Sequence, residues 1–175
     1  MKNALSLLVG SGFLLMNVIK RINNQAAFSL LEVLISVVVL AIGLLGIAAM
    51  QLNMIRYNHS AHMRSIAIAQ ANNMLDSMRA NYAGVEAGQY NSISGIPADP
   101  ACTNCSISEI AQRDAHIWNS YNSDLLPSGQ GTVTNNGGTF TITVRWDNNR
   151  TGATGLGCSG NPLVDLTCLT MEVQL

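Results

Sequence analysis

The sequence predicts an α+β protein in which one long N-terminal helix packs on a small antiparallel sheet. No proline occurs between Phe28 and Ile96, so the chain can stay helical over a long distance. The 23 residues from Val33 to Ile55 include no ionisable side chain. Near the C-terminus, two segments alternate apolar and polar residues, as half-buried strands do. Hydrophobic residues make up 48% of the chain and charged residues only 11%, which is more apolar than an ordinary soluble domain.

Residues 1–27 are expected to form a basic leader. The apolar run ALSLLVGSGFLLM precedes Lys20 and Arg21, whereas a secretory signal peptide has its charges before the apolar run. A short basic leader starting at Met16 fits this order better, which leaves the true start codon open. The positive charges before the span, with no Asp or Glu before Glu32, predict a cytoplasmic N-terminus.

Residues 28–55 are expected to cross a membrane. At about 1.5 Å per residue the uncharged run reaches roughly 35 Å, enough for a hydrocarbon core of about 30 Å. Glu32 is the anomaly, because an ionised carboxylate within such a helix costs roughly 2.5–3.5 kcal/mol on insertion scales. Gly43 and Gly46 indicate local unwinding or the close approach of another helix, or else only the frequency of small residues in membrane helices.

Residues 56–83 continue the helix with one apolar stripe, and the helix is expected to end near Ala83 and Gly84. The stripe consists of Met63, Ile66, Ala67, Ala71, Met74, Leu75, Met78 and Tyr82.

Residues 84–175 are expected to form a periplasmic head. Its first part, 84–105, is rich in Gly, Ser, Asn and Pro and is interpreted as a loop. Ser106 and Glu109 form a capping box that opens a helix running to about Leu125. The expected inner face of this helix is Ile110, Ile117, Trp118, Tyr121 and Leu125.

Strands follow. Segments 131–134 and 139–147 flank NNGG, which is a hairpin turn signal. Residues 140, 142, 144 and 146 are apolar in strict alternation, and so are 169, 171, 173 and 175. These patterns predict a three- or four-stranded antiparallel sheet that packs on the amphipathic half of the long helix.

The stretch AFSLLEVL, which starts at Ala27, resembles the type III signal of type IV pilins and type II secretion pseudopilins. The resemblance implies the pilin fold, cleavage between Ala27 and Phe28 by a prepilin peptidase, and methylation of the new amino terminus. Ala27 stands where the family usually has Gly. Phe28 would then carry a cationic amine with Glu32 four residues on, at the helix end whose dipole favours a carboxylate. In the family this Glu attracts the terminal amine of a neighbouring subunit; the alternative is that Glu32 only caps its helix and reaches the headgroups.

The segment 113–148 resembles the core of PilV-type minor pilins, in which a helix bearing Trp leads to LP-x-G-x-G-x-V and a strand ending in V-x-W-D. The matching residues are Trp118, Leu126, Pro127, Gly129, Gly131, Val133, Val144, Trp146 and Asp147.

Four cysteines, Cys102, Cys105, Cys158 and Cys168, all follow the span, where an oxidising periplasm lets disulfides persist. Two structural disulfides are expected, and proximity favours 102 with 105 and 158 with 168, although all three connectivities stay open. A zinc site or a redox motif is the weaker interpretation, because the second pair is spaced too widely and no thioredoxin-like pattern surrounds the first.

Other candidate sites are weak. His59 and His62 lack a third metal ligand, and Asp114 and His116 are two apart on a helix and so point away from each other. No enzyme activity, metal or cofactor is expected. With a net charge of −1 and no basic patch, nucleic-acid binding is not expected either.

Together these patterns predict a minor pilin that helps to prime and assemble a type IV pilus and supports twitching motility or attachment. Its expected partners are the prepilin peptidase, other minor pilins, the major pilin and a tip adhesin. It would sit in the inner membrane as a single-pass protein and later at the pilus tip. The alternatives are a minor pseudopilin of type II secretion, an adhesin or ligand-binding tip module using loops 84–105 and 148–168, and an uncut single-pass membrane protein.

Overall fold

The computed structural model describes residues 29–175. The predicted leader and the predicted cleavage site at Ala27 and Phe28 lie outside the described residues. The chain divides into two compact units, with the boundary between Ala49 and Met50.

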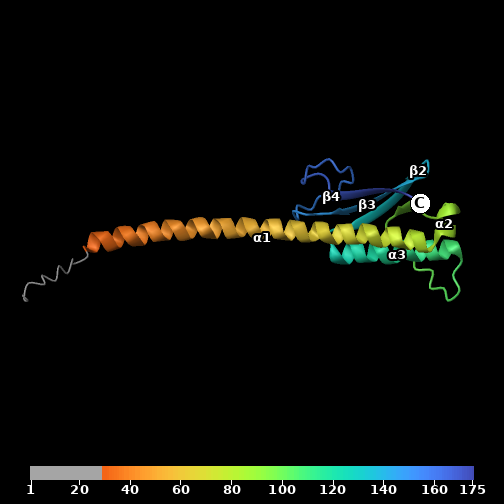
Figure 1. The fold of residues 1–175 in the computed structure, drawn as a ribbon, viewed down its shortest axis with the longest axis horizontal. Coiled ribbons are helices and arrows are strands. Elements are labelled where there is room, and N and C mark those ends of the chain that lie inside the picture. Colours follow the sequence, from red (N-terminus) through yellow and green to blue (C-terminus); the bar gives the residue numbers. More distant parts are fainter. Residues whose placement is uncertain (1–28) are drawn as a thin grey trace, which may run out of the picture. The chain divides into compact units, whose positions relative to one another are not determined.

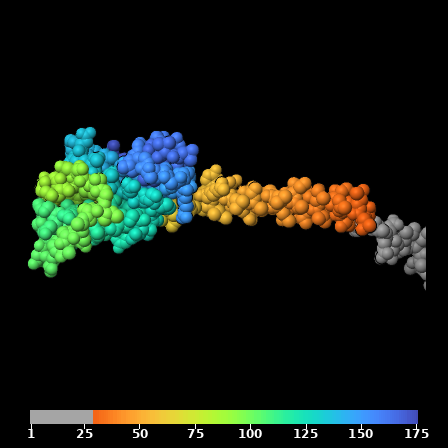
Figure 2. Space-filling model, turned by 180° about the vertical axis from the view of Figure 1, so that it is seen from behind, coloured from red at the N-terminus to blue at the C-terminus, as the bar shows by residue number. Residues whose placement is uncertain are grey.

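Helix α1, Leu30–Ala80, is 51 residues long and continues through the boundary between the units. In the first unit it is a lone helix, and every described residue there is exposed (Figure 2). It runs without a break through Gly43 and Gly46, so the local unwinding considered for these glycines is not seen. The prediction of one proline-free helix of more than fifty residues is confirmed.

The second half of α1 buries one stripe of side chains against the head. The buried residues recur every three or four positions, as one helix face requires. They are Met63, Ala67, Gln70, Ala71, Met74, Leu75 and Met78, and Ile66 packs at their edge.

Tyr82 is 49% exposed and was wrongly assigned to this stripe. The reason is that α1 ends at Ala80, where the chain turns into the short helix α2, Tyr82–Glu86. Asn81 is buried at this corner, and its amide donates to Tyr90 Oη at 3.1 Å and to the carbonyl of Ile107 at 3.0 Å.

Four antiparallel strands form the sheet in the order β1-β2-β3-β4 (Figure 1). They are β1 (Ser92–Ser94), β2 (Gln130–Asn136), β3 (Thr139–Trp146) and β4 (Thr167–Gln174). The interpretation of 84–105 as a loop was wrong in part, since the segment includes the end of α2 and all of β1. Strand β1 has one apolar residue, Ile93, and it is specified by pairing with the distant β2 rather than by a local pattern.

The β2–β3 hairpin follows the prediction from NNGG. Asn136 pairs with Thr139, which leaves Gly137 and Gly138 as the two turn residues. Their φ angles of +62° and +94° are the left-handed values that such tight turns need and that glycine adopts without strain.

The alternating residues of β3 form the centre of the core. Phe140, Ile142, Val144 and Trp146 are all buried, and β4 places Val173, Met171 and Leu169 opposite the first three. The predicted α+β class, with a long helix packed on a small antiparallel sheet, is therefore confirmed.

Helix α3, Ile107–Leu125, begins with the predicted capping box, in which Ser106 and Glu109 bond reciprocally. Its predicted inner face was wrong in three positions, because Ile117, Tyr121 and Leu125 are 44%, 55% and 46% exposed. The helix buries a face of small, amide and indole side chains instead: Ala111, Ala115, Trp118, Asn119 and Asn122.

Hydrogen bonds explain why α3 buries amides in place of larger apolar residues. Asn119 Oδ1 accepts the backbone N–H of Gly131 on β2 at 2.6 Å, and its amide donates to the carbonyl of Gly95 at 2.7 Å. Trp118 Nε1 donates to the backbone carbonyl of Gln70 on α1 at 2.8 Å, which ties α3 to the long helix. Hydrogen bonds of this kind allow Asn119 and the Trp118 indole to be buried. Asn122 is only partly satisfied, because its Oδ1 accepts no hydrogen bond within the described residues.

Gly131 on β2 lies directly against α3, because a Cβ there would overlap the Trp118 ring and the Asn122 amide. We expect Gly131→Ala to destabilise the head by about 1–3 kcal/mol through overpacking. Urea unfolding of the full chain in detergent, followed by the fluorescence of Trp118 and Trp146, measures the change. Gly43→Ala is the control, because its added methyl meets nothing within 4 Å; equal unfolding midpoints for both variants would contradict the prediction.

Candidate functional site

The start of α1 is organised by Ser29. Its hydroxyl accepts the N–H of Leu31 at 3.3 Å, and its carbonyl accepts the N–H groups of Glu32 at 2.9 Å and Val33 at 3.2 Å. Capping of this kind satisfies donors that a helix end leaves unpaired. Glu32 is thereby held in the first turn, where the helix dipole favours its negative charge.

The Glu32 carboxylate is exposed and lies among apolar side chains. Within residues 29–175 the single ion pair is Arg79–Asp76, so no described residue pairs with Glu32. The amine of Phe28, which the sequence suggests as a partner, lies outside the described residues. A group that neutralises Glu32 in an apolar setting must therefore come from outside residues 29–175 or from another molecule.

A long, largely apolar surface surrounds Glu32 and continues to Ile55. Its large side chains are at least 49% exposed, and Leu30 reaches 89%. They are Leu30, Leu31, Val33, Leu34, Ile35, Val37, Val38, Val39, Leu40, Ile42, Leu44, Leu45, Ile47, Met50, Leu52, Met54 and Ile55. Among the described helices, α1 alone is long and apolar enough to cross a membrane. A surface of this size is normally covered by lipid or by other protein.

The polar groups considered for catalysis bond to different partners. The Tyr90 hydroxyl donates to Asp114 Oδ2 at 2.6 Å, while His116 Nδ1 lies 2.8 Å from the carbonyl of Pro97. Burial raises the pKa of Tyr90, and its bond to Asp114 raises it further, so the phenol stays protonated and donates. Asp114 and His116 are thus not brought together as an acid–base pair, and the Asp114 carboxylate fixes Tyr90 in the core.

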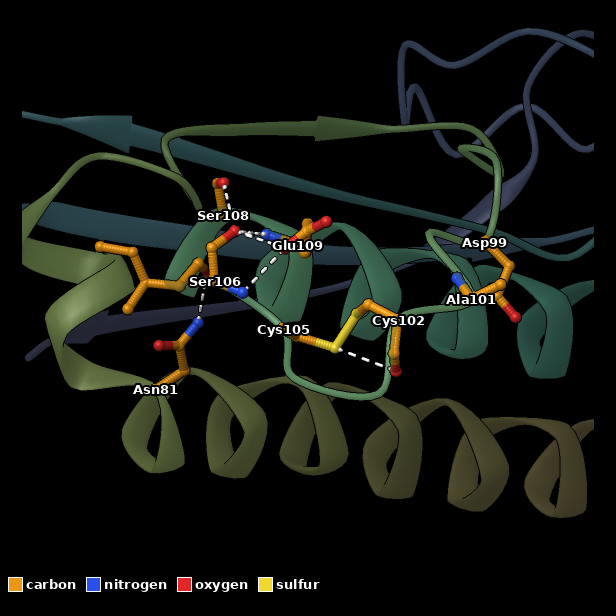
Figure 3. The surroundings of a disulfide bond; sticks show 9 residues. Asn81, Asp99, Ala101, Cys102, Cys105, Ser106, Ser108 and Glu109 are labelled. Atoms are coloured by element: carbon orange, nitrogen blue, oxygen red, sulfur yellow. Dashed lines mark hydrogen bonds between the residues drawn. A yellow bond between two sulfur atoms is a disulfide. The ribbon is translucent and has the colours of Figure 1, made fainter.

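Both disulfides join near neighbours, Cys102 with Cys105 and Cys158 with Cys168. This is the local pairing that proximity favoured. The first bridge closes a tight loop directly before the Ser106 capping box of α3 (Figure 3). The second ties the loop before β4 to the strand itself.

Among the described residues, no three His, Cys, Asp or Glu side chains gather as a metal site, and His59 and His62 remain without a third ligand.

Two carboxylates organise the loop between β3 and β4: Asp147, which the sequence indicated only as the end of a strand pattern, and Asp165, which no sequence pattern indicated. Asp147 accepts the N–H groups of Thr151 at 3.1 Å and Gly152 at 2.8 Å. Asp165 accepts those of Gly157 at 3.2 Å and Ser159 at 3.0 Å. The glycines around each aspartate were the available signal, because backbone N–H groups can converge on a carboxylate most easily where side chains are absent.

Residues 22–48 match the family model of the prokaryotic N-terminal methylation motif. The match supports a type IV pilin-like prepilin. It covers Glu32, the capped start of α1 and much of the exposed apolar surface, and the α+β layout of the described residues fits the pilin fold. A pilin-type motif also suggests a structural protein anchored in a membrane and processed by a prepilin peptidase. No curated protein and no solved structure shows a significant match to the chain.

The loop carboxylates make the head sensitive to acid. Hydrogen bonds from Ser159 hold the pKa of Asp165 below its ordinary value. For Asp147 burial raises the pKa, but the bonds from Gly152 and Thr151 lower it more, and the net pKa is also lowered. A carboxylate whose pKa is lower in the folded state than in the unfolded state stabilises the folded state at any pH above its unfolded pKa, which is about 3.9 for Asp. This stabilisation is lost as the pH falls through the folded-state pKa.

We therefore expect loop 148–166 to lose hydrogen-exchange protection, corrected for intrinsic rates, as the pH falls below about 4. Asp165→Asn should lower protection already at pH 6 and weaken the remaining pH dependence. Glu86→Gln, which alters an exposed carboxylate outside this loop, is the matched control. Protection of the loop that is identical at pH 6 and pH 3 in the unmodified protein would show that these carboxylates do not hold it.

Proposed function

We propose that the chain is a minor pilin of a bacterial type IV pilus, cut between Ala27 and Phe28 by prepilin peptidase and methylated on the new terminus. The observation that carries the proposal is Glu32, a lone carboxylate in the first turn of an uncovered apolar helix, inside the matched methylation motif.

The mechanism follows from comparing lipid with a fibre core. The Leu, Ile and Val side chains of α1 gain about 1.5–3 kcal/mol each on leaving water, but lipid and packed helices offer them similar surroundings. Apolar contact alone therefore gives a subunit little reason to move from the membrane into a fibre or to stop at one register. A carboxylate does, because its attraction to the cationic amine of a neighbouring subunit is strong in a low dielectric and is greatest when the two charges are in contact.

The expected partners are those of such a subunit: prepilin peptidase, other minor pilins, the major pilin and a tip adhesin. In the membrane state the N-terminus would be cytoplasmic and the head periplasmic, and after assembly the subunit would lie at or near the pilus tip. There it would help to prime the filament and support twitching motility or attachment.

A minor pseudopilin of type II secretion is the second candidate, because the methylation motif supports both classes equally. The resemblance of residues 113–148 to PilV-type minor pilins favours the pilus. In the structure these residues form one connected unit, in which α3 packs on the β2–β3 hairpin through Trp118 and Gly131. Trp118 and Gly131 both belong to the residues that match the PilV-type pattern, and this contact brings them together.

The assembly role of Glu32 is tested by Glu32→Ala and Glu32→Gln. Both variants should insert in the membrane and lose the leader, yet be at least tenfold depleted from sheared surface fibres, since a loss of about 1.4 kcal/mol already lowers incorporation tenfold. Quantitative immunoblots of membrane and fibre fractions measure the ratio. Glu86→Ala, at an exposed carboxylate of the head, is the control. Incorporation of the Glu32 variants at the control level would rule out charge pairing.

The choice between pilus and secretion system needs a deletion strain. Loss of surface piliation and twitching with normal release of exoproteins is the result we expect. Normal piliation with blocked exoprotein release would assign the chain to type II secretion. Complementation with the unmodified gene excludes effects on neighbouring genes.

A further inference from the structure

A cavity of about 660 Å³ lies where α1 emerges from its uncharged run and meets the loop after β3. Both walls belong to the second compact unit. One wall consists of Arg56, Tyr57 and His59 of α1, and the other of Asn148, Asn149 and Arg150.

The charge of the cavity is positive. Arg56 and Arg150 line it, and no carboxylate does. In the described part of the chain neither guanidinium forms an ion pair. Asp147, the carboxylate next to Arg150 along the loop, already accepts the N–H groups of Thr151 and Gly152. Arg150 also lines a neighbouring cavity together with Asp124 and Asp147, although neither carboxylate forms an ion pair with it. Because no carboxylate lines the cavity that Arg56 and Arg150 share, the two arginines would gain from an anion placed between them.

The amides in the cavity wall also offer donors rather than acceptors. Trp146 Nε1, at the buried end of β3, donates to Asn148 Oδ1 at 3.2 Å, and the Asn148 amide donates to Asn149 Oδ1 at 3.2 Å. Each amide oxygen thus already accepts one hydrogen bond, whereas the Asn149 NH₂ group makes none within residues 29–175 and is free to donate. Arg150 sits at φ +52°, a left-handed conformation that is uncommon for arginine, held by the turn in which its N–H donates to Asp147 O at 3.3 Å. The turn thus holds Arg150 beside the amides in an unfavourable conformation, as functional sites often do.

The position of Arg56 in the chain indicates which anion the cavity would bind. Arg56 directly follows Ile55, the last residue of the uncharged run, which at roughly 35 Å is slightly longer than the hydrocarbon core. When the run spans a membrane, Arg56 lies at the level of the phospholipid headgroups. The anion most concentrated there is the lipid phosphate, and guanidinium groups bind phosphate with paired hydrogen bonds.

We propose that this cavity is a headgroup site that binds the phosphate of an anionic phospholipid while the subunit is in the membrane. The site would orient the head at the membrane surface before assembly. The bound lipid would stay in the membrane when the subunit leaves it for the fibre. It needs only the membrane-spanning state, so it stands or falls independently of cleavage and of the pilus assignment.

The test uses the full chain purified in a neutral detergent and mixed with phosphatidylglycerol or phosphatidylcholine of the same acyl chains. Native mass spectrometry measures the lipid retained. We expect preferential retention of phosphatidylglycerol, and about fivefold weaker retention for each of Arg56→Gln and Arg150→Asn, since one Arg near an anionic lipid surface contributes about that factor. Asparagine is chosen at 150 because it tolerates a left-handed backbone.

Arg64→Gln is the matched control, because Arg64 is exposed on the same helix and does not line the cavity. Unchanged fluorescence of the buried Trp118 and Trp146 verifies that each variant is folded. An equal loss for Arg64→Gln would show diffuse attraction and overturn the site. Equal retention of both lipids, or displacement of phosphatidylglycerol by millimolar inorganic phosphate, would overturn its assignment to anionic lipid.

Discussion

An apolar helix surface without a cover, carrying one carboxylate at its start, is the constraint on which the rest of the molecule depends. Between Leu30 and Ile55 no side chain is buried within the chain itself. A surface of this kind is normally covered by lipid or by other helices, and within the described residues Glu32 has no ion-pair partner that would neutralise it there. Lipid and a bundle of helices satisfy the apolar residues equally well, so the carboxylate is the part of the surface that distinguishes a specific assembly from mere insertion.

The head is built to keep the second half of α1 attached to a small sheet. Buried stripe residues such as Met74 and Met78 provide apolar contact, and the bond from Trp118 to the Gln70 carbonyl fixes the position of α3 along the helix. The β3–β4 loop is held by backbone bonds to Asp147 and Asp165 and by the second disulfide. The same loop carries Arg150, so its order also places the cationic cavity next to Arg56.

Features of this fold that depend on local signals could be predicted from the sequence, and those that depend on distant partners could not. The long helix, the capping box at Ser106, the NNGG turn and the alternation in β3 each lie within a few consecutive residues. Strand β1 exists only because β2 pairs with it across the head. The inner face of α3 was misassigned because Asn119 is buried by hydrogen bonds to Gly95 and Gly131, which no helical periodicity reveals. Of the candidate site, Glu32 and the cysteines were recognisable, whereas the cavity required the loop to fold back on α1.

The most direct test of the central claim is the mass of the N-terminal tryptic peptide of the protein isolated from its native membrane. Trypsin cuts after Arg21 and Arg56 and nowhere between them, because no Lys or Arg lies in 22–55. A processed subunit must yield the peptide 28–56 carrying one extra methyl group on the Phe28 amine. Recovery of the unmodified peptide 22–56 in its place would show that the leader is retained, and would contradict the account of Phe28 and Glu32 as the charged start of an assembling helix.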